Sequence, residues 1–200
     1  MLQASAAGLL AGLTLIVAIG AQNAYVLRQG LLRSHIGPVV AVCALSDLIL
    51  IAAGVSGIGA IVAHAGWVLT VVRWFGVAFL VWYAVGSLRR ARHAESLAAA
   101  AEARQDSRGR VLARVVALTW LNPHVYLDTV LLLGSIAQGY HGQRWWFAVG
   151  AGLASIVWFS ALGFGARLAA PVLALPRAWQ VLEVLIGLTM LLIAVKLALG

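Results

Sequence analysis

Six long apolar stretches occupy most of this 200-residue chain and limit what it can fold into. A helix that crosses the hydrocarbon core of a bilayer needs about 20 mostly apolar residues. Six segments are long enough, at residues 4–27, 36–62, 66–88, 111–137, 145–170 and 178–199. All but one of the connections between them are short. We therefore predict an all-α integral membrane protein with six transmembrane helices and no soluble domain.

The composition excludes other classes of protein. Hydrophobic residues make up 63% of the chain and charged residues 10%. In a soluble domain about 45–50% of the residues are apolar and about 25% are charged. So much apolar surface excludes a disordered chain. A single soluble core of 200 residues could not bury it either. Lipid must therefore solvate most of the chain.

The basic residues predict how the chain lies in the membrane. Eleven of them lie in the loops after the first, third and fifth segments or at the start of the fourth: Arg28, Arg33, Arg89, Arg90, Arg92, Arg104, Arg108, Arg110, Arg114, Arg167 and Arg177. Three lie on the other side: Arg73, Arg144 and Lys196. Because basic loops stay in the cytoplasm, we expect these loops inside and both termini outside.

The two halves of the sequence resemble each other. Asn23 aligns with Asn122, and Ser46 aligns with Ser155, although the offsets differ and require loops of different length. Three helices per half is an odd number, so the second half would cross the membrane upside down. Such inverted-topology repeats are common in secondary transporters. The alternative is that apolar helices look alike by chance.

This similarity divides the single membrane domain into three parts. Residues 1–88 form the first three-helix repeat, and residues 111–200 form the second. The polar stretch between them, 89–110, is a cytoplasmic linker whose Ala, Glu and Arg residues favour a short surface helix. The predicted fold class is therefore a 3+3 inverted-topology repeat of six transmembrane helices.

Two carboxylates lie deep in apolar segments. Asp47 is near the centre of the second segment, and Asp128 is just past the centre of the fourth. Glu183, near the start of the sixth, can reach the interface. Ionisable residues at membrane depth are costly and usually functional, so Asp47 and Asp128 are candidates to hold protons or a cation. The alternative is a static bond to a neighbouring serine, tyrosine or histidine.

The polar residues of the fourth segment surround a helix break. Pro123 removes a backbone hydrogen bond and breaks the helix next to Asn122. A break at membrane depth is tolerated where it faces protein or a water-filled cavity. His124 and Asp128 are four residues apart and so share one helix face, and Asn122 forms a second such pair with Tyr126.

The first segment has a counterpart of this break. Gly20 permits local unwinding, and Gln22 and Asn23 offer amide donors and acceptors on two faces. Tyr25 adds a hydroxyl near the same place. If both helices break, their ends could hold the carboxylate and ammonium of an amino acid.

No cofactor, metal site or enzyme is expected. Cys43 is the only cysteine, the five histidines lack ligand spacing, and there is no phosphate-binding loop or nucleophile elbow. The weak candidates for an intramembrane enzyme are the pairs Ser46/Asp47 and His124/Asp128. Basic residues at the ends of apolar segments favour anionic lipid headgroups as partners and argue against nucleic acid.

Several motifs resemble the lysine/arginine exporter (LysE) family. They are GAQNAYVLRQGL at 20–31, ALSDLILIAAGVSGIGA at 44–60, TWLNPHVYLDTVLLLG at 119–134 and GFGA at 163–166. The resemblance is to the basic amino acid branch, because the neutral branch tends to carry PGPN and NPK where this chain has GAQN and NPH. It covers nearly the whole chain, and the linker is the least specific part.

The resemblance implies a secondary transporter in the bacterial inner membrane that exports L-lysine and L-arginine. It also implies coupling to proton or hydroxide movement and to membrane potential, as in an antiporter, and a family whose members often form homo-oligomers. Five and six helices have both been proposed for the family, and the charge count of this chain favours six. The alternatives are an exporter of a neutral amino acid or a metal cation, or a membrane protein that transports nothing.

A mechanistic hypothesis joins the resemblance to the buried polar residues. The breaks around Gln22 and Asn122 hold the α-carboxylate and α-ammonium of a basic amino acid, and Asp47 or Asp128 takes its side-chain cation or a coupling proton. The predicted substrate-binding residues are Gln22, Asn23, Tyr25, Asp47, Asn122, His124 and Asp128, with Asp47 and Asp128 coupling protons and Gly20 and Pro123 breaking the helices.

Overall fold

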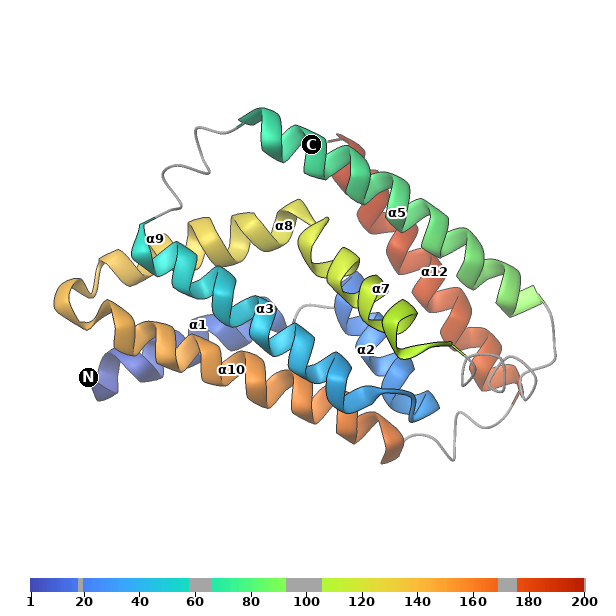
Figure 1. Ribbon diagram of the computed structural model, residues 1–200, viewed down its shortest axis with the longest axis horizontal. Coiled ribbons are helices and arrows are strands. Elements are labelled where there is room, and N and C mark those ends of the chain that lie inside the picture. Colours follow the sequence, from blue (N-terminus) through green and yellow to red (C-terminus); the bar gives the residue numbers. More distant parts are fainter. Residues whose placement is uncertain (18–19, 58–65, 93–105, 169–175, 200) are drawn as a thin grey trace.

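The computed structural model describes residues 1–17, 20–57, 66–92, 106–168 and 176–199. Within these ranges all regular structure is helical (Figure 1). The α-helices are α1 (Leu2–Ile16), α2 (Ala21–Leu32), α3 (Ile36–Ser56), α5 (Gly66–Arg92), α7 (Arg108–Trp120), α8 (Pro123–Val125), α9 (Gly134–Gln138), α10 (Arg144–Gly165) and α12 (Pro176–Leu199). A π-helix, η1 (Tyr126–Leu133), joins α8 to α9, and two short 3-10 helices, η2 (His141–Gln143) and η3 (Ala166–Leu168), flank α10. The predicted all-α class is confirmed.

Four of the described helices are long and apolar enough to cross a membrane: Ile36–Ser56, Thr70–Arg92, His141–Leu168 and Trp179–Leu199. Two further spans are bent pairs. α1 meets α2 at 83°, and α7 meets the segment Pro123–Gln138 at 58°. The described chain therefore has four candidate spans, or six if each bent pair counts as one.

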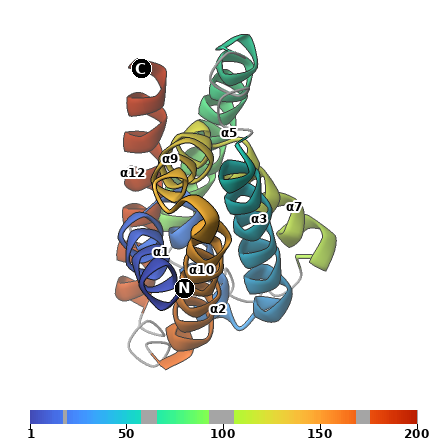
Figure 2. The same ribbon diagram turned by 90° about the vertical axis from the view of Figure 1, so that its left-hand side faces the viewer.

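The helices form two groups that meet at the bent pairs. α1, α3 and α10 run alongside one another, whereas α5 and α12 pair with each other (Figure 1). In Figure 2 the upper ends of α5 and α12 rise above the first group. α2 and α7 lie between the two groups, so each bent span reaches from one group to the other.

Small residues allow the closest helix contacts. A Cβ added to Gly150 of α10 would collide with the backbone carbonyl of Ser5 in α1, and one added to Gly8 would collide with the carbonyl of Phe147. A Cβ on Gly134 of α9 would lie 2.7 Å from a backbone oxygen of α3. Close approach of backbones through small residues is typical of membrane helices.

Two apolar cores hold the groups together. The larger one joins α2, α3, α5, α7 and α12 around buried side chains such as Tyr25, Leu118 and Met190. The smaller one joins α1, α3, α9 and α10 around Ile51 and Phe147. On the outer faces, large apolar side chains are exposed on α5, α10 and α12, as a helix bundle solvated by lipid requires.

The structure corrects two boundaries. The first segment is two helices at 83° rather than one continuous helix over 4–27. The linker is shorter than 89–110, because α5 continues through Arg92 and α7 begins at Arg108. The surface helix expected in the linker falls mostly on residues 93–105, outside the described ranges.

Candidate functional site

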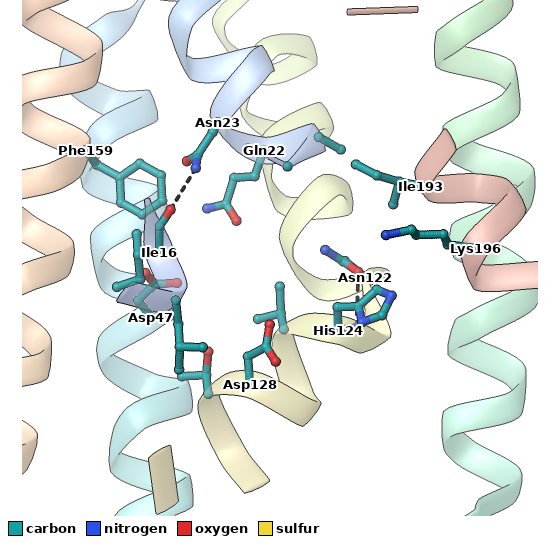
Figure 3. Close-up of a pocket in the computed structure, with 15 residues that line it drawn as sticks. Ile16, Gln22, Asn23, Asp47, Asn122, His124, Asp128, Phe159, Ile193 and Lys196 are labelled. Carbon is teal, nitrogen blue, oxygen red and sulfur yellow. Dashed lines mark hydrogen bonds between the residues drawn. The ribbon is translucent and has the colours of Figure 1, made fainter. Parts of the chain in front are cut away.

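A pocket of about 330 Å³ lies where the two bent spans meet α3, α10 and α12 (Figure 3). Ligand pockets are typically about 300–1,000 Å³, so this volume suits a small molecule. Fifteen residues line it: Leu15, Ile16, Gly20, Ala21, Gln22, Asn23, Asp47, Asn122, His124, Val125, Asp128, Thr129, Phe159, Ile193 and Lys196. Six of the seven predicted substrate-binding residues are among them.

The second break is built by the Asn-Pro pair. The backbone of Asn122 is extended, and its side-chain oxygen accepts a hydrogen bond of 3.1 Å from the amide of His124. Pro123 occupies the first turn of the new helix, where its missing N–H costs nothing. The hydroxyl of Tyr126 donates a 2.8 Å hydrogen bond to the carbonyl of Trp120. The backbone groups freed by the break therefore find polar partners.

The first break uses the asparagine that aligns with Asn122. The amide of Asn23 donates a 2.7 Å hydrogen bond to the carbonyl of Ile16, at the end of α1 (Figure 3). Its side-chain oxygen accepts a 3.3 Å bond from the indole of Trp158. Asn23 therefore ties α1, α2 and α10 together at the pocket wall. Gly20, extended at the start of α2, lines the pocket beside it.

Gln22 contributes a free hydrogen-bond donor. Its side-chain nitrogen is buried and has no partner within the described residues. A buried amide nitrogen without an acceptor costs free energy, typically about 1–3 kcal/mol. Because Gln22 lines the pocket, a bound ligand with an acceptor oxygen would satisfy this nitrogen.

Asp47 is buried at the inner wall of the pocket. Only 6% of the residue is exposed, and its carboxylate accepts a 2.7 Å hydrogen bond from the hydroxyl of Ser155 on α10. The static bond to a serine, the alternative to a functional role, is thus present. One hydrogen bond leaves most of the acceptor capacity of a carboxylate unused, and no cation of the described chain lies within 4.0 Å of it.

Asp128 and His124 reach the pocket from the second break. Asp128 is half-buried and His124 is exposed, and both line the pocket as predicted. Asp128 lies in the π-helix η1, so the regular four-residue spacing assumed for an α-helix does not apply to it. π-helical turns occur frequently at functional sites. Within the described residues, Asp128 also has no ion-pair partner.

The structure does not bring Tyr25 to this pocket. Its side chain is fully buried in the larger core, its hydroxyl donates to the carbonyl of Val111 at 3.3 Å, and its ring meets Tyr83 edge-on with centroids 5.8 Å apart. Pro123 is buried at the break and does not line the pocket either.

Lys196 is a pocket residue that the sequence analysis missed. It lies near the end of α12, and its side chain points toward Asn122 and His124 (Figure 3). Its position at the end of an apolar segment led to its interpretation as a topology signal. A second signal was available, because Lys196 is the only lysine among fourteen basic residues.

Glu183 and Arg28 belong to a separate ion-pair cluster. Glu183 is 1% exposed, so its carboxylate lies inside the helix bundle. The Nε of Arg28 lies 2.8 Å from one Glu183 carboxylate oxygen, and Arg90 Nη2 lies 3.1 Å from the other. Ser87 also donates to this carboxylate. Arg28 is buried too, so it is not a loop residue that only sets topology.

The arrangement suits a charged organic ligand better than a metal ion. No group of three His, Cys, Asp or Glu residues able to hold a metal occurs among the residues described. Ser46 accepts a 3.1 Å hydrogen bond from Trp120 rather than pairing with Asp47. The pocket instead gathers carboxylates, amides and one ammonium group around a small cavity.

Comparisons with known proteins identify the family of this chain. The profile of the LysE type translocator family matches residues 13–200. An arginine exporter protein ArgO from Salmonella schwarzengrund is 42% identical over 96% of this chain and 91% of its own length. Another, from Pectobacterium carotovorum, is 43% identical over 96% and 94%. No solved structure matches. The chain therefore belongs to the LysE family of translocators, which are membrane transporters and not enzymes.

Proposed function

We propose that this protein exports basic amino acids, with L-arginine as the main substrate and L-lysine as a second one, across the bacterial inner membrane. The observation that carries the proposal is the pocket at two helix breaks, where neither Asp47 nor Asp128 forms an ion pair within the described residues. The sequence analysis placed lysine first. The names of the relatives favour arginine.

The pocket offers a place for each end of such a substrate. Asp47 and Asp128 are anionic partners for its cations, and the free nitrogen of Gln22 is a donor for an oxygen. Asn23 and Asn122 shape the pocket more than they contact substrate, because their side chains already bind the backbone at the breaks.

Proton coupling would compensate for the positive charge that the exported amino acid carries across the membrane. Expelling one positive charge against an inside-negative potential costs about 2.3 kcal/mol per 100 mV. A proton that enters as the cation leaves cancels this charge movement. Asp47 or Asp128 carries that proton when the pocket holds no substrate, so the protein works as an antiporter.

Alternating access follows from the two bent spans. We propose that residues 1–88 and 111–200 are inverted repeats, whose equivalent breaks at Gly20 and Pro123 meet at the pocket. The repeats rock against each other around this site. The exposed apolar faces of α5 and α12 leave room for a homo-oligomer in the membrane.

Counterflow in proteoliposomes tests the substrate. Liposomes containing the purified protein are loaded with unlabelled L-arginine, L-lysine, L-threonine or a divalent metal salt, and uptake of labelled L-arginine is followed. We expect arginine and lysine to drive uptake. Uptake driven by threonine would point to a neutral amino acid exporter, and uptake driven only by the metal to a metal carrier. Either result would overturn the proposal.

The orientation can be tested by cysteine labelling. Cys43 is buried, which favours a low background from the native thiol. We propose that both termini lie outside, so Ser107→Cys, just before α7, should react with an impermeant thiol reagent only after the cells are permeabilised. His141→Cys, on the opposite side, should react in intact cells. The reverse pattern would contradict the proposed orientation.

A further inference from the structure

The pocket holds one ammonium group, and the function of the site does not yet account for it. Lys196 projects from α12 toward Asn122 and His124, and Asp47 lies across the pocket (Figure 3). Lys196 is exposed, so water can solvate its charge when the pocket is empty. Its ammonium would repel a cationic substrate that brought it no negative partner.

The described part of the protein supplies no such partner. No carboxylate lies within 4.0 Å of the Lys196 ammonium among the described residues. Its neighbourhood differs from that of Arg73, whose guanidinium donates a 2.5 Å hydrogen bond to the carbonyl of Ala198 at the end of the same helix. Lys196 therefore has its charge available for a ligand in the pocket.

The charges of the pocket match those of a basic amino acid. At neutral pH arginine and lysine each carry two cationic groups and one carboxylate. The pocket carries the reverse, with two carboxylates, Asp47 and Asp128, and one ammonium, Lys196. We propose that Lys196 binds the α-carboxylate of the substrate, while Asp47 and Asp128 take its two cations. This inference rests on the proposed function and names a residue that sets its specificity.

The consequence is a preference for amino acids over simple cations. Agmatine, the decarboxylated form of arginine, has both cations and no carboxylate. It would leave the Lys196 ammonium without a partner next to its own charges. Unpaired or like charges in a binding site are penalised strongly, which is a common basis of specificity. Lys196 thus disfavours agmatine as a ligand of the pocket.

Competitive binding to the purified protein tests the inference. The affinities of L-arginine and agmatine are measured for the native protein and for Lys196→Gln, which keeps the length of the side chain and removes its charge. We expect the native protein to prefer arginine by at least about tenfold, as for a lost charge partner. In Lys196→Gln the affinity for arginine should fall by a similar factor, while the affinity for agmatine should stay the same or rise. The preference for arginine over agmatine should then disappear.

Two further variants act as controls. Lys196→Arg keeps the charge and should retain most of the preference. Arg177→Gln removes an exposed cation from the first turn of the same helix, outside the pocket, and should change neither affinity. An unchanged preference in Lys196→Gln, or an equal loss for both ligands, would overturn the role of Lys196.

The outcome for Lys196 can be separated from the fate of the proposed function. If Asp128→Asn abolishes arginine binding while Lys196→Gln leaves the preference intact, the pocket binds substrate and the assignment of Lys196 is wrong. If neither variant affects arginine binding, the pocket is not the substrate site, and both proposals fail.

Discussion

Two polar regions lie within this apolar protein. In one the buried carboxylate is ion-paired, and in the other the carboxylates form no ion pair within the described residues. In the ion-pair cluster, Glu183 is buried between Arg28 and Arg90 and accepts a further hydrogen bond from Ser87. In the pocket, Asp47 has one serine as its partner, and Asp128 has no ion pair in the described structure. Both regions join helices that are distant in sequence.

The difference separates structural charges from functional ones. A buried carboxylate with two guanidinium partners is already neutralised, and adding a ligand would require breaking those bonds. The Glu183 cluster therefore holds α2 against α5 and α12. A buried carboxylate without a cation remains costly until a cation or a proton arrives. We therefore propose that the pocket residues bind the substrate, whereas the cluster positions α2, which carries part of the pocket.

Neutralising Glu183 should have the largest effect on stability. Glu183→Gln leaves Arg28 buried without its counter-charge, and breaking a buried pair typically costs about 3–5 kcal/mol. Thermal unfolding in detergent micelles, followed by tryptophan fluorescence, should shift to a clearly lower temperature. Asp128→Asn is the matched control, because it removes a charge that has no ion-pair partner. Equal unfolding temperatures for both variants would contradict the contrast between the two regions.

Adding a side chain at the contact between α1 and α10 should lower the free energy of unfolding by a smaller amount. In Gly150→Ala the new Cβ collides with the carbonyl of Ser5, so the helices must separate at an expected cost of about 1–3 kcal/mol. The same unfolding measurement checks this. Gly109→Ala, where nothing lies within 4 Å of the added Cβ, should be neutral or slightly stabilising. A neutral Gly150→Ala would mean that the two helices are not in contact as described.

Removing the cap at the second break should have a smaller effect. Asn122→Ala loses the hydrogen bond from the amide of His124, and such caps contribute about 1 kcal/mol. Ser107→Ala is the control, because Ser107 precedes α7 but makes no side-chain cap bond. The two variants should therefore differ in unfolding temperature, with Asn122→Ala the lower. Identical temperatures would show that the cap at Asn122 does not stabilise the break.

The exposed ion pair at the start of α7 should matter least. Arg110 lies 3.0 Å from Asp106, and its side chain is 65% exposed. Exposed pairs typically contribute about 0.2–1 kcal/mol and are screened by salt. Arg110→Gln should therefore change the unfolding temperature slightly at low ionic strength and not at high salt. A shift as large as that of Glu183→Gln would contradict the distinction between buried and exposed charges.

The elements that depend on local sequence could be predicted. Apolar stretches of about 20 residues defined the spans, because hydrophobicity alone decides what can enter lipid. Pro123 and Asn122 located the second break, because a proline and a capping side chain act on their immediate neighbours. Gly20 marked the first one in the same way.

The contacts between distant residues could not be predicted. Arg28 and Glu183 are 155 residues apart, and their meeting depends on the 83° bend that turns α2 toward α12. Composition indicates only that both are charged. The pocket position of Lys196 was missed for a similar reason, because it depends on how α12 packs against distant helices. The π-helix at Asp128 was not predicted either, although Asp128 lines the pocket with His124 as expected.

Transport by variants of the pocket carboxylates tests most directly whether they bind the cargo. Labelled L-arginine counterflow is measured in proteoliposomes containing the native protein, Asp47→Asn, Asp128→Asn or Asp106→Asn, whose carboxylate lies outside the pocket. We predict that the two pocket variants fall to the level of protein-free liposomes although they fold and reconstitute normally, while Asp106→Asn transports at the native rate. Native rates in both pocket variants would contradict the claim that these unpaired carboxylates bind the exported cation.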